Sequence, residues 1–207
     1  MQEMYIEKAA GKLKLLDELK EITPVGSYTL FLRHGDRDKI PEGEFGNEVE
    51  LNAFGKHRSV EFGKSIRHLN INRIFCSPIK RCVQTAEGIA LGLERKTEIE
   101  TSTLLGDPGA FVHDGKLAGE SFLQMGFNNC YESLLQHVPV NGNYDISDGA
   151  NLLDDFFMNQ SKVEGTNIYI SHDMIVALYA WERFRKKFTL GENWVKFLGG
   201  LIIKNQK

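Results

Sequence analysis

The stretch that decides the fold of this 207-residue chain is Tyr28-Thr-Leu-Phe-Leu-Arg33-His34-Gly35-Asp36-Arg37. Its first half, residues 29–32, is a short apolar and β-prone run of the kind that forms a buried parallel strand. Its second half is an abrupt cluster of ionisable side chains around a glycine. Ligands of open α/β sheets bind beyond the carboxyl ends of the strands, so this cluster is expected where a site would form.

The side chains of this cluster suit an anion. Arg33 and Arg37 offer planar, permanently charged guanidinium groups that match phosphate or carboxylate. Gly35 lets the backbone turn and approach a ligand closely. The protonation state of His34 would respond to these cations and to any anion that they hold. An Arg-His-Gly segment taken alone is more often a solvated turn, so support for a site has to come from the rest of the chain.

Composition indicates one globular domain over residues 1–207. Hydrophobic residues make up 42% and charged residues 26%, and the net charge of -3 argues against nucleic acid as a partner. Cys76, Cys82 and Cys130 lack CxxC spacing, so neither a disulfide framework nor a zinc knuckle is expected. The beginning of the chain does not resemble a signal peptide, and there is no run of about 20 apolar residues. We therefore expect a cytoplasmic protein that does not bind membranes; its oligomeric state stays open.

Strand-like and helix-like patterns alternate along the chain. Strands are expected at residues 29–32, 73–76, 97–104, 167–171 and within 194–203, and helices at 51–66, 78–91, 121–137, 151–162 and 174–186. This alternation predicts an α/β fold with a mainly parallel central sheet flanked by helices on both faces. An amphipathic helical extension is expected at about 1–22, and a long irregular, lid-like region at about 106–149.

Two local features sharpen these expectations. Ser77 is expected to cap the helix that Pro78 begins, because serine satisfies free backbone N–H groups and proline suits the first helical position. In the helix at 51–66, Phe54, Phe62 and Ile66 are expected to point inward.

Three of the expected strands end in polar groups. The first leads to Arg33, His34 and Arg37, and the strand at 167–171 leads to His172 and Asp173. The strand at 73–76 leads into Ser77-Pro-Ile-Lys-Arg81-Cys-Val-Gln-Thr-Ala. If these strands are parallel neighbours, all three groups open on the same rim of the sheet and form one site.

This combination resembles the histidine phosphatase superfamily, which has a phosphoglycerate-mutase-like fold. The resemblance rests on Arg-His-Gly, on Ser-Pro-x-x-Arg-x-x-Gln-Thr-Ala and on the late strand-end histidine, and it covers residues 32–89 and 168–180. It implies that His34 is the nucleophile and that Arg33, Arg81 and His172 clamp the phosphoryl group. Arg37 and the His172-Asp173 pair are more similar to the acid-phosphatase-like branch, so the chain resembles a compact member with mixed features.

The resemblance implies a phosphomonoesterase that needs no metal or other cofactor. A neutral His34 would attack phosphorus and form a phosphohistidine. Arg33, Arg37, Arg81 and a protonated His172 would hold the phosphoryl oxygens and their developing charge. The expected partner is a phosphorylated small-molecule substrate, with specificity set by residues 38–50 and 106–149.

A carboxylic acid must protonate the leaving alcohol and then activate water. Asp173 is favoured because it follows His172 directly, as the catalytic aspartate does in the acid-phosphatase-like branch. Asp107 is the rival, since compact mutase-like members place their acid after the third strand.

Three other functions compete with a phosphatase. A phosphoglycerate-type mutase would usually carry a small hydroxyl residue after Arg-His-Gly, where Asp36 and Arg37 stand here. A non-catalytic phosphate- or phosphopeptide-binding module would not need an imidazole nucleophile. A metallohydrolase could use His34, Asp36, His172 and Asp173 as ligands, but the flanking arginines would repel a divalent cation.

Overall fold

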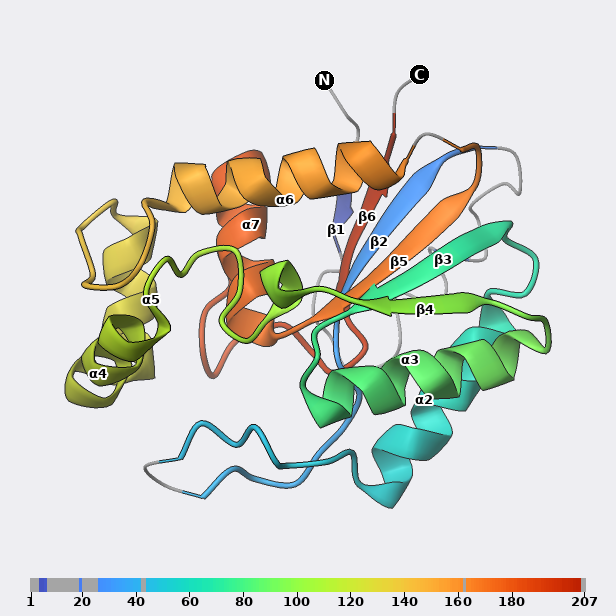
Figure 1. Ribbon diagram of the computed structural model, residues 1–207, viewed down its shortest axis with the longest axis horizontal. Helices are drawn as coiled ribbons and strands as arrows, with labels where there is room; N and C mark the ends of the chain where they lie inside the picture. The colour runs from blue at the N-terminus through green and yellow to red at the C-terminus, as the bar shows by residue number, and fades with distance from the viewer. Residues whose placement is uncertain (1–3, 7–18, 20–25, 42–43, 162, 206–207) are drawn as a thin grey trace.

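A six-stranded sheet with strand order β1-β6-β2-β5-β3-β4 forms the centre of the molecule (Figure 1). The computed structural model describes residues 4–6, 19, 26–41, 44–161 and 163–205. The strands are β1 (Met4–Ile6), β2 (Tyr28–Arg33), β3 (Ile71–Cys76), β4 (Glu98–Thr101), β5 (Thr166–Ser171) and β6 (Gly200–Lys204). Strands β2, β5, β3 and β4 pair in parallel, whereas β6 is antiparallel to β2 and β1 is antiparallel to β6.

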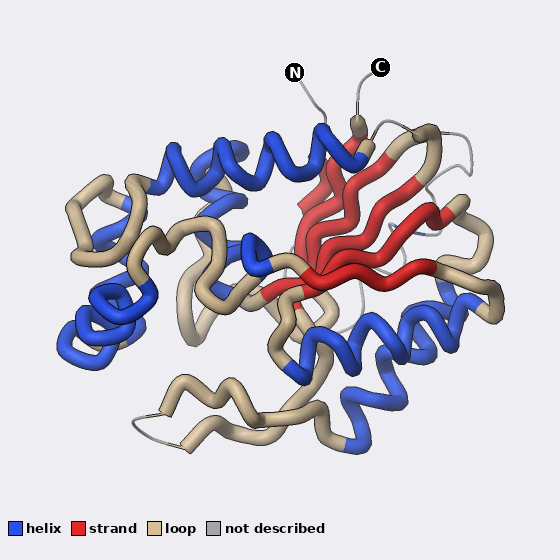
Figure 2. Tube along the Cα trace, viewed as in Figure 1, coloured by secondary structure: helices blue, strands red, loops and turns tan. Residues whose placement is uncertain are grey.

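Helices cover both faces of this sheet, as the sequence predicted (Figures 1 and 2). On one face lie α2 (Ala53–Ser65) and α3 (Lys80–Leu93), and on the other lie α6 (Ile146–Gln160) and α7 (Asp173–Phe184). The remaining helices, α4 (Gly115–Met125) and α5 (Phe127–Leu135), stand beyond the sheet at the far end of α6. Among the described residues, no helix is long and apolar enough to cross a membrane.

Alternation along the strands builds two separate cores. Phe31 of β2 packs with Phe157 of α6 and Tyr179 of α7, at ring-centroid distances of 5.2 and 5.6 Å. Its neighbours Leu30 and Leu32 belong to the other core, under α2 and α3. Each of these buried side chains stabilises the fold by about 1.5–3 kcal/mol relative to exposure to water. The strands that carry the site are therefore held from both faces.

The amino-terminal prediction is wrong for residues 4–6 and right for Leu19, which is helical and buried. Residues 4–6 form β1, an edge strand that pairs with β6, and not the start of a helix. Residues 7–18 and 20–25, which hold most of the predicted helical extension, lie outside the described residues. Edge pairing with β6 outweighs the helical spacing of a few apolar side chains, because spacing is only a weak guide to short segments.

Three other expectations need correction. Phe54 is 61% exposed on α2 and does not point inward. The third parallel strand, β4, ends at Thr101, and the 3-10 turn Thr103–Leu105 follows it. The region at 106–149 holds two helices instead of one, because the chain breaks between them at Gly126, whose φ of +77° is a conformation that glycine tolerates.

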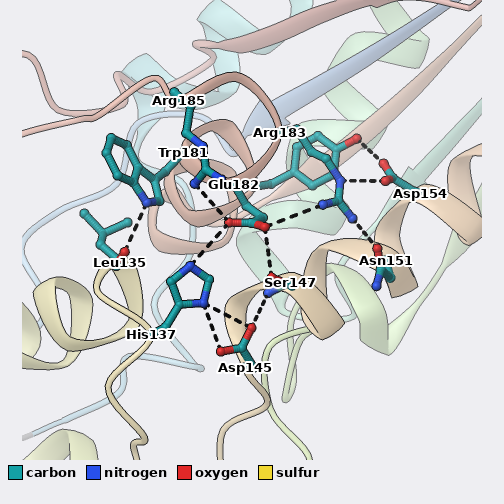
Figure 3. Close-up of polar contacts among 11 residues, drawn as sticks. Leu135, His137, Asp145, Ser147, Asn151, Asp154, Trp181, Glu182, Arg183 and Arg185 are labelled. Atoms are coloured by element: carbon teal, nitrogen blue, oxygen red, sulfur yellow. Dashed lines mark hydrogen bonds and ion pairs between the residues drawn. The ribbon is translucent and has the colours of Figure 1, made fainter. Parts of the chain in front are cut away.

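A polar network joins the end of α5 to α6 and α7 (Figure 3). Its centre is Glu182, whose side chain is only 9% exposed. Glu182 accepts a hydrogen bond from the Ser147 hydroxyl at 2.9 Å and lies 3.4 Å from Arg185 and 3.9 Å from His137 Nε2. His137 therefore has a structural role in this network.

We predict that Glu182→Ala loosens the docking of α5 and α6 on α7. The substitution leaves the partly buried Ser147 hydroxyl without its acceptor and removes the ion pairs of Arg183 and Arg185 with Glu182. The free energy of unfolding should therefore fall by about 2 kcal/mol. Urea unfolding measures this value. The control is Glu132→Ala, which removes a surface pair with Lys187 whose side chains are both 43% exposed and should cost under about 0.5 kcal/mol. Equal effects of the two substitutions would contradict the central role of Glu182.

Candidate active site

The register of the parallel strands brings the predicted groups to one rim. Arg33 at the end of β2 is paired with Ser171 at the end of β5, and Ile170 of β5 is paired with Cys76 of β3. The next residue along β2 is His34, whose backbone N–H donates to the Ser171 carbonyl at 2.9 Å. As a result the imidazole rings of His34 and His172 lie with centroids 5.5 Å apart. The predicted convergence of three strand ends is confirmed.

Arg81 joins the two histidines. It lies in the first turn of α3, directly after β3, and is 95% buried. Its Nε–H donates to Nε2 of His34 at 3.1 Å, and one terminal N–H donates to Nδ1 of His172 at 3.2 Å. The other terminal nitrogen donates to the carbonyl of Gly46, in the loop after β2. One guanidinium therefore sets the position of both rings and of the loop above them.

These contacts define the tautomers of both imidazoles. A guanidinium only donates, so Nε2 of His34 and Nδ1 of His172 are the unprotonated ring nitrogens. In His34, Nδ1 carries the proton and donates it to the Gly35 carbonyl at 2.8 Å. In His172, Nε2 carries the proton, 3.1 Å from the Ser77 hydroxyl. Nε2 of His34 is thus the unprotonated nitrogen of the ring, and in the free site its lone pair accepts from Arg81.

Burial and neighbouring charges keep both rings neutral. Burial lowers the pKa of His34 well below its usual range, and His172, Arg81 and Arg33 lower it further. Burial and the charge of Arg81 lower the pKa of His172 to about 3. His172 is therefore neutral in the free site, and the protonated His172 expected against phosphoryl oxygens stays a prediction for the anion-bound site. A bound anion would reverse this effect, since a negative charge close by favours the imidazolium.

Arg33 lies beside the cavity without lining it. Its guanidinium donates to the Val195 carbonyl at 2.6 Å, pairs with Asp173 at 2.8 Å and stacks over the ring of Phe197 with 4.0 Å to the ring centre. Arg37 does line the cavity, and one of its terminal nitrogens donates to the Asp38 carbonyl at 2.7 Å. The Nε–H groups of Arg33 and Arg37 are buried without a hydrogen-bond partner among the described residues. Buried donors that lack a partner can be satisfied by an oxyanion.

The two candidate acids lie in different surroundings. Asp173 is the first residue of α7, and its Oδ2 accepts from Arg33 and from the indole N–H of Trp194 at 3.1 Å. Asp107 is exposed on the cavity rim, in the turn after β4. Gly106 places this turn directly against His172, because a Cβ at Gly106 would lie 2.5 Å from the ring. Both carboxyls line the cavity, but the carboxyl of Asp173 forms an ion pair with Arg33.

The four residues of the metallohydrolase alternative are not arranged as a set of metal ligands. Asp36 pairs with Arg58 at 2.8 Å, and Asp173 pairs with Arg33. Within the part of the chain that the structure describes, no group of three histidine, cysteine or acidic side chains is placed to hold a metal ion.

The helix motif contributes three positions whose roles the sequence reading missed. Ser77 does not cap α3, which begins at Lys80; its hydroxyl contacts His172 instead. The hydroxyl of Thr85 accepts from the Gly35 N–H at 2.9 Å and fixes the turn beside His34. The Gln84 amide oxygen accepts from the Leu51 N–H at 2.8 Å, where the loop rejoins α2. The Gln-Thr spacing after Arg81 was the signal that could have indicated them.

These groups surround a cavity of about 330 Å³. Its lining residues come from the loop after β2, the start of α3, the turn after β4, α4, α5 and the start of α7. Residues 38–50 and 106–149, predicted to set specificity, thus form much of its wall.

Residues 29–107 match the model of the histidine phosphatase superfamily, branch 1. This match confirms the resemblance to the histidine phosphatase superfamily. It contains His34 and Arg81 and ends at Asp107. No curated protein matches the chain.

Solved structures share the fold. YhfR from Bacillus stearothermophilus aligns with a TM-score of 0.55 at 16% identity, over 87% of this chain and 92% of that one. A phosphoglycerate mutase from Bacillus anthracis aligns with a TM-score of 0.55 at 15% identity, over 86% and 92%. A mutant phosphoserine phosphatase from Entamoeba histolytica, in complex with phosphoserine, aligns at 0.53 and 18% identity, over 81% and 87%. At these identities the likeness shows the phosphoglycerate-mutase-like fold.

We predict that the imidazole signals of His34 and His172 in NMR spectra do not titrate between about pH 6 and pH 8 in the free protein, because both pKa values lie below this range. Saturating phosphate or tungstate should raise the pKa of His172, and Arg81→Ala should abolish this response at the same anion concentration. Titration of either ring near its ordinary pKa in the free protein would contradict the neutral pair.

The same shifts have a consequence for stability. The pKa of His172 is about 3 in the folded protein and about 6.5 in the unfolded chain, so between these values the unfolded chain binds more protons. The contribution of this residue to the free energy of unfolding therefore falls as pH is lowered through that window.

Proposed function

We propose that this protein is a metal-independent phosphomonoesterase that acts on a phosphorylated small molecule through a phosphohistidine at His34. The observation that carries the proposal is the tautomer of His34, whose unprotonated Nε2 accepts from Arg81 in a cavity that Arg37, Arg81 and His172 also line. A phosphate that takes over the Arg81 N–H would free this lone pair to attack phosphorus. A phosphate dianion placed there would meet buried guanidinium donors, and charge-assisted contacts of this kind are the strong ones.

The proposed reaction has two steps. In the first, Nε2 of His34 attacks phosphorus, the bond from phosphorus to the ester oxygen breaks, and the leaving alcohol takes a proton from a carboxylic acid. In the second, water attacks the phosphohistidine, gives a proton to that carboxylate, and the phosphorus–nitrogen bond breaks to release inorganic phosphate. Arg37, Arg81 and His172 stabilise the phosphoryl oxygens in both steps. Arg33 does not line the cavity and contributes through its ion pair with Asp173.

We assign the general acid to Asp107, in place of the Asp173 that the sequence favoured. Asp107 stands on the cavity rim without an ion-pair partner among the described residues, and so it can exchange its proton with solvent between turnovers. Asp173 already neutralises Arg33, and a proton on its carboxyl would weaken that 2.8 Å pair. Asp173 is then a positioning residue for Arg33.

The other functions fit the contacts less well. A binding module would gain nothing from a histidine lone pair held by Arg81. A mutase has to hold a second acidic group of its substrate. Beyond the phosphate-binding residues, however, the charged side chains that line the cavity among the described residues are the carboxylates Glu44, Asp107 and Asp173.

We expect phosphate to be trapped on His34. After a brief reaction with substrate and an alkaline quench that preserves phosphohistidine, peptide mass spectrometry should find one added phosphoryl group on His34. His34→Ala should lower kcat at least about 10³-fold while leaving the fold intact, because the nucleophile is lost and its ring contributes little to either core. A phosphoryl group on serine, cysteine or aspartate would refute the mechanism.

We expect replacement of the general acid to affect substrates according to the pKa of their leaving group. Asp107→Asn should reduce kcat/KM for an alkyl phosphate by about 10²-fold or more and change that for p-nitrophenyl phosphate far less, because nitrophenolate leaves without a proton. Asp173→Asn should impair both substrates alike, since it releases Arg33. The reverse pattern would return the acid role to Asp173.

A further inference from the structure

We infer that the cavity selects phosphomonoesters whose alcohol is apolar, above all aromatic, and discriminates against alcohols that carry a second anionic group. This inference rests on the proposed function for the role of the phosphate, and it concerns the part of the cavity beyond His34, Arg81 and His172.

An aromatic wall forms one part of this outer cavity. Phe45 from the loop after β2, Phe122 from α4 and Phe127 from α5 all line it. The ring centroids of Phe45 and Phe122 lie 5.7 Å apart, and those of Phe122 and Phe127 lie 6.0 Å apart. These rings form a row, and Trp194 extends it behind Phe127 at 5.4 Å. Offset and edge-on contacts between rings at such distances are favourable, so a further ring placed against Phe45 would extend the series.

The exposure of Phe45 supports this interpretation. Phe45 lines the cavity, yet its side chain is 47% exposed. Apolar side chains add to the lining around it: Ile40, Ile79, Pro108, Met174 and Ile175. A ligand that covers this apolar surface gains free energy in proportion to the area removed from water. The 330 Å³ volume lies at the lower end of the range for small-molecule sites, which favours a compact alcohol.

The charges of the cavity disfavour the binding of substrates whose alcohol carries an acidic group. Its cations among the described residues, Arg37 and Arg81, belong to the phosphate-binding end. The carboxylates in its lining are Glu44, Asp107 and Asp173, so a carboxylate or second phosphate on the alcohol would meet apolar side chains and like charge. Both effects penalise a second anion, because it loses its hydration and gains no cationic partner.

A matched set of three esters tests the inference. The set is propyl phosphate, the same ester with a terminal phenyl ring, and the same ester with a terminal carboxylate, so that the leaving oxygen stays a primary alkoxide throughout. Binding is measured by calorimetry on His34→Ala, which cannot turn the esters over. The phenyl ester should bind about tenfold or more tightly than propyl phosphate, and the carboxylate ester at least about threefold more weakly.

Two substitutions in the same background locate the effect. Phe45→Ala should remove most of the phenyl advantage and leave the affinity for propyl phosphate unchanged, which also reports that the fold is intact. Phe54→Ala removes a ring of similar exposure that does not line the cavity and should change neither affinity. Glu44→Gln should reduce the difference in affinity between propyl phosphate and the carboxylate ester.

Equal affinity for all three esters, or tightest binding of the carboxylate ester, would overturn the inference. Turnover by the unsubstituted protein is measured separately. Failure to hydrolyse any of the three, with the expected order of affinities intact, would sink the proposed function and leave the selectivity of the cavity standing.

Discussion

The site depends on one buried guanidinium. Arg81 donates to Nε2 of His34 and to Nδ1 of His172, and these two bonds decide which nitrogen of each ring keeps its lone pair. A lysine could not replace it, because a single ammonium lacks the planar fork that reaches two rings and the Gly46 carbonyl at once. The position of Arg81 follows in turn from β3, which ends beside β5 and begins α3 at the rim of the sheet.

Burying so much positive charge has a cost that the fold offsets locally. Burial lowers the pKa values of Arg33, Arg37 and Arg81, which reflects the penalty for removing a cation from water. Asp173 neutralises Arg33, but the Nε–H groups of Arg33 and Arg37 stay without a partner among the described residues. An anion bound in the cavity would pair with Arg37, and the free energy of binding that anion would offset part of the penalty.

The same arrangement links binding to chemistry. The neighbouring cations hold His34 neutral, which is the state that a nucleophile needs, and they hold the phosphate that it would attack. The anion would in turn favour a proton on His172, which then becomes a further donor to the phosphoryl oxygens. Charge on the substrate would therefore prepare the second imidazole as a donor.

The sequence by itself determined the elements that carry the site. The apolar run before Arg33, the alternation of strands and helices, and the polar groups at three strand ends were enough to predict a parallel sheet and a convergent rim that includes His34, Arg81 and His172. Strand alternation and chain order are local properties, and the rule that parallel strands share a carboxyl edge turns them into a position in space.

Tertiary structure alone decided how those side chains are used. No local pattern could show that Asp173 pairs with Arg33, that Ser77 contacts His172 instead of capping α3, or that His172 is neutral in the free site. The aromatic wall could not be predicted either, since Phe45 lies far from Phe122 and Phe127 in the chain and meets them only when α4 and α5 fold over the loop after β2. Charge state and pocket shape depend on distances between segments remote in sequence, and packing of the whole chain sets those distances.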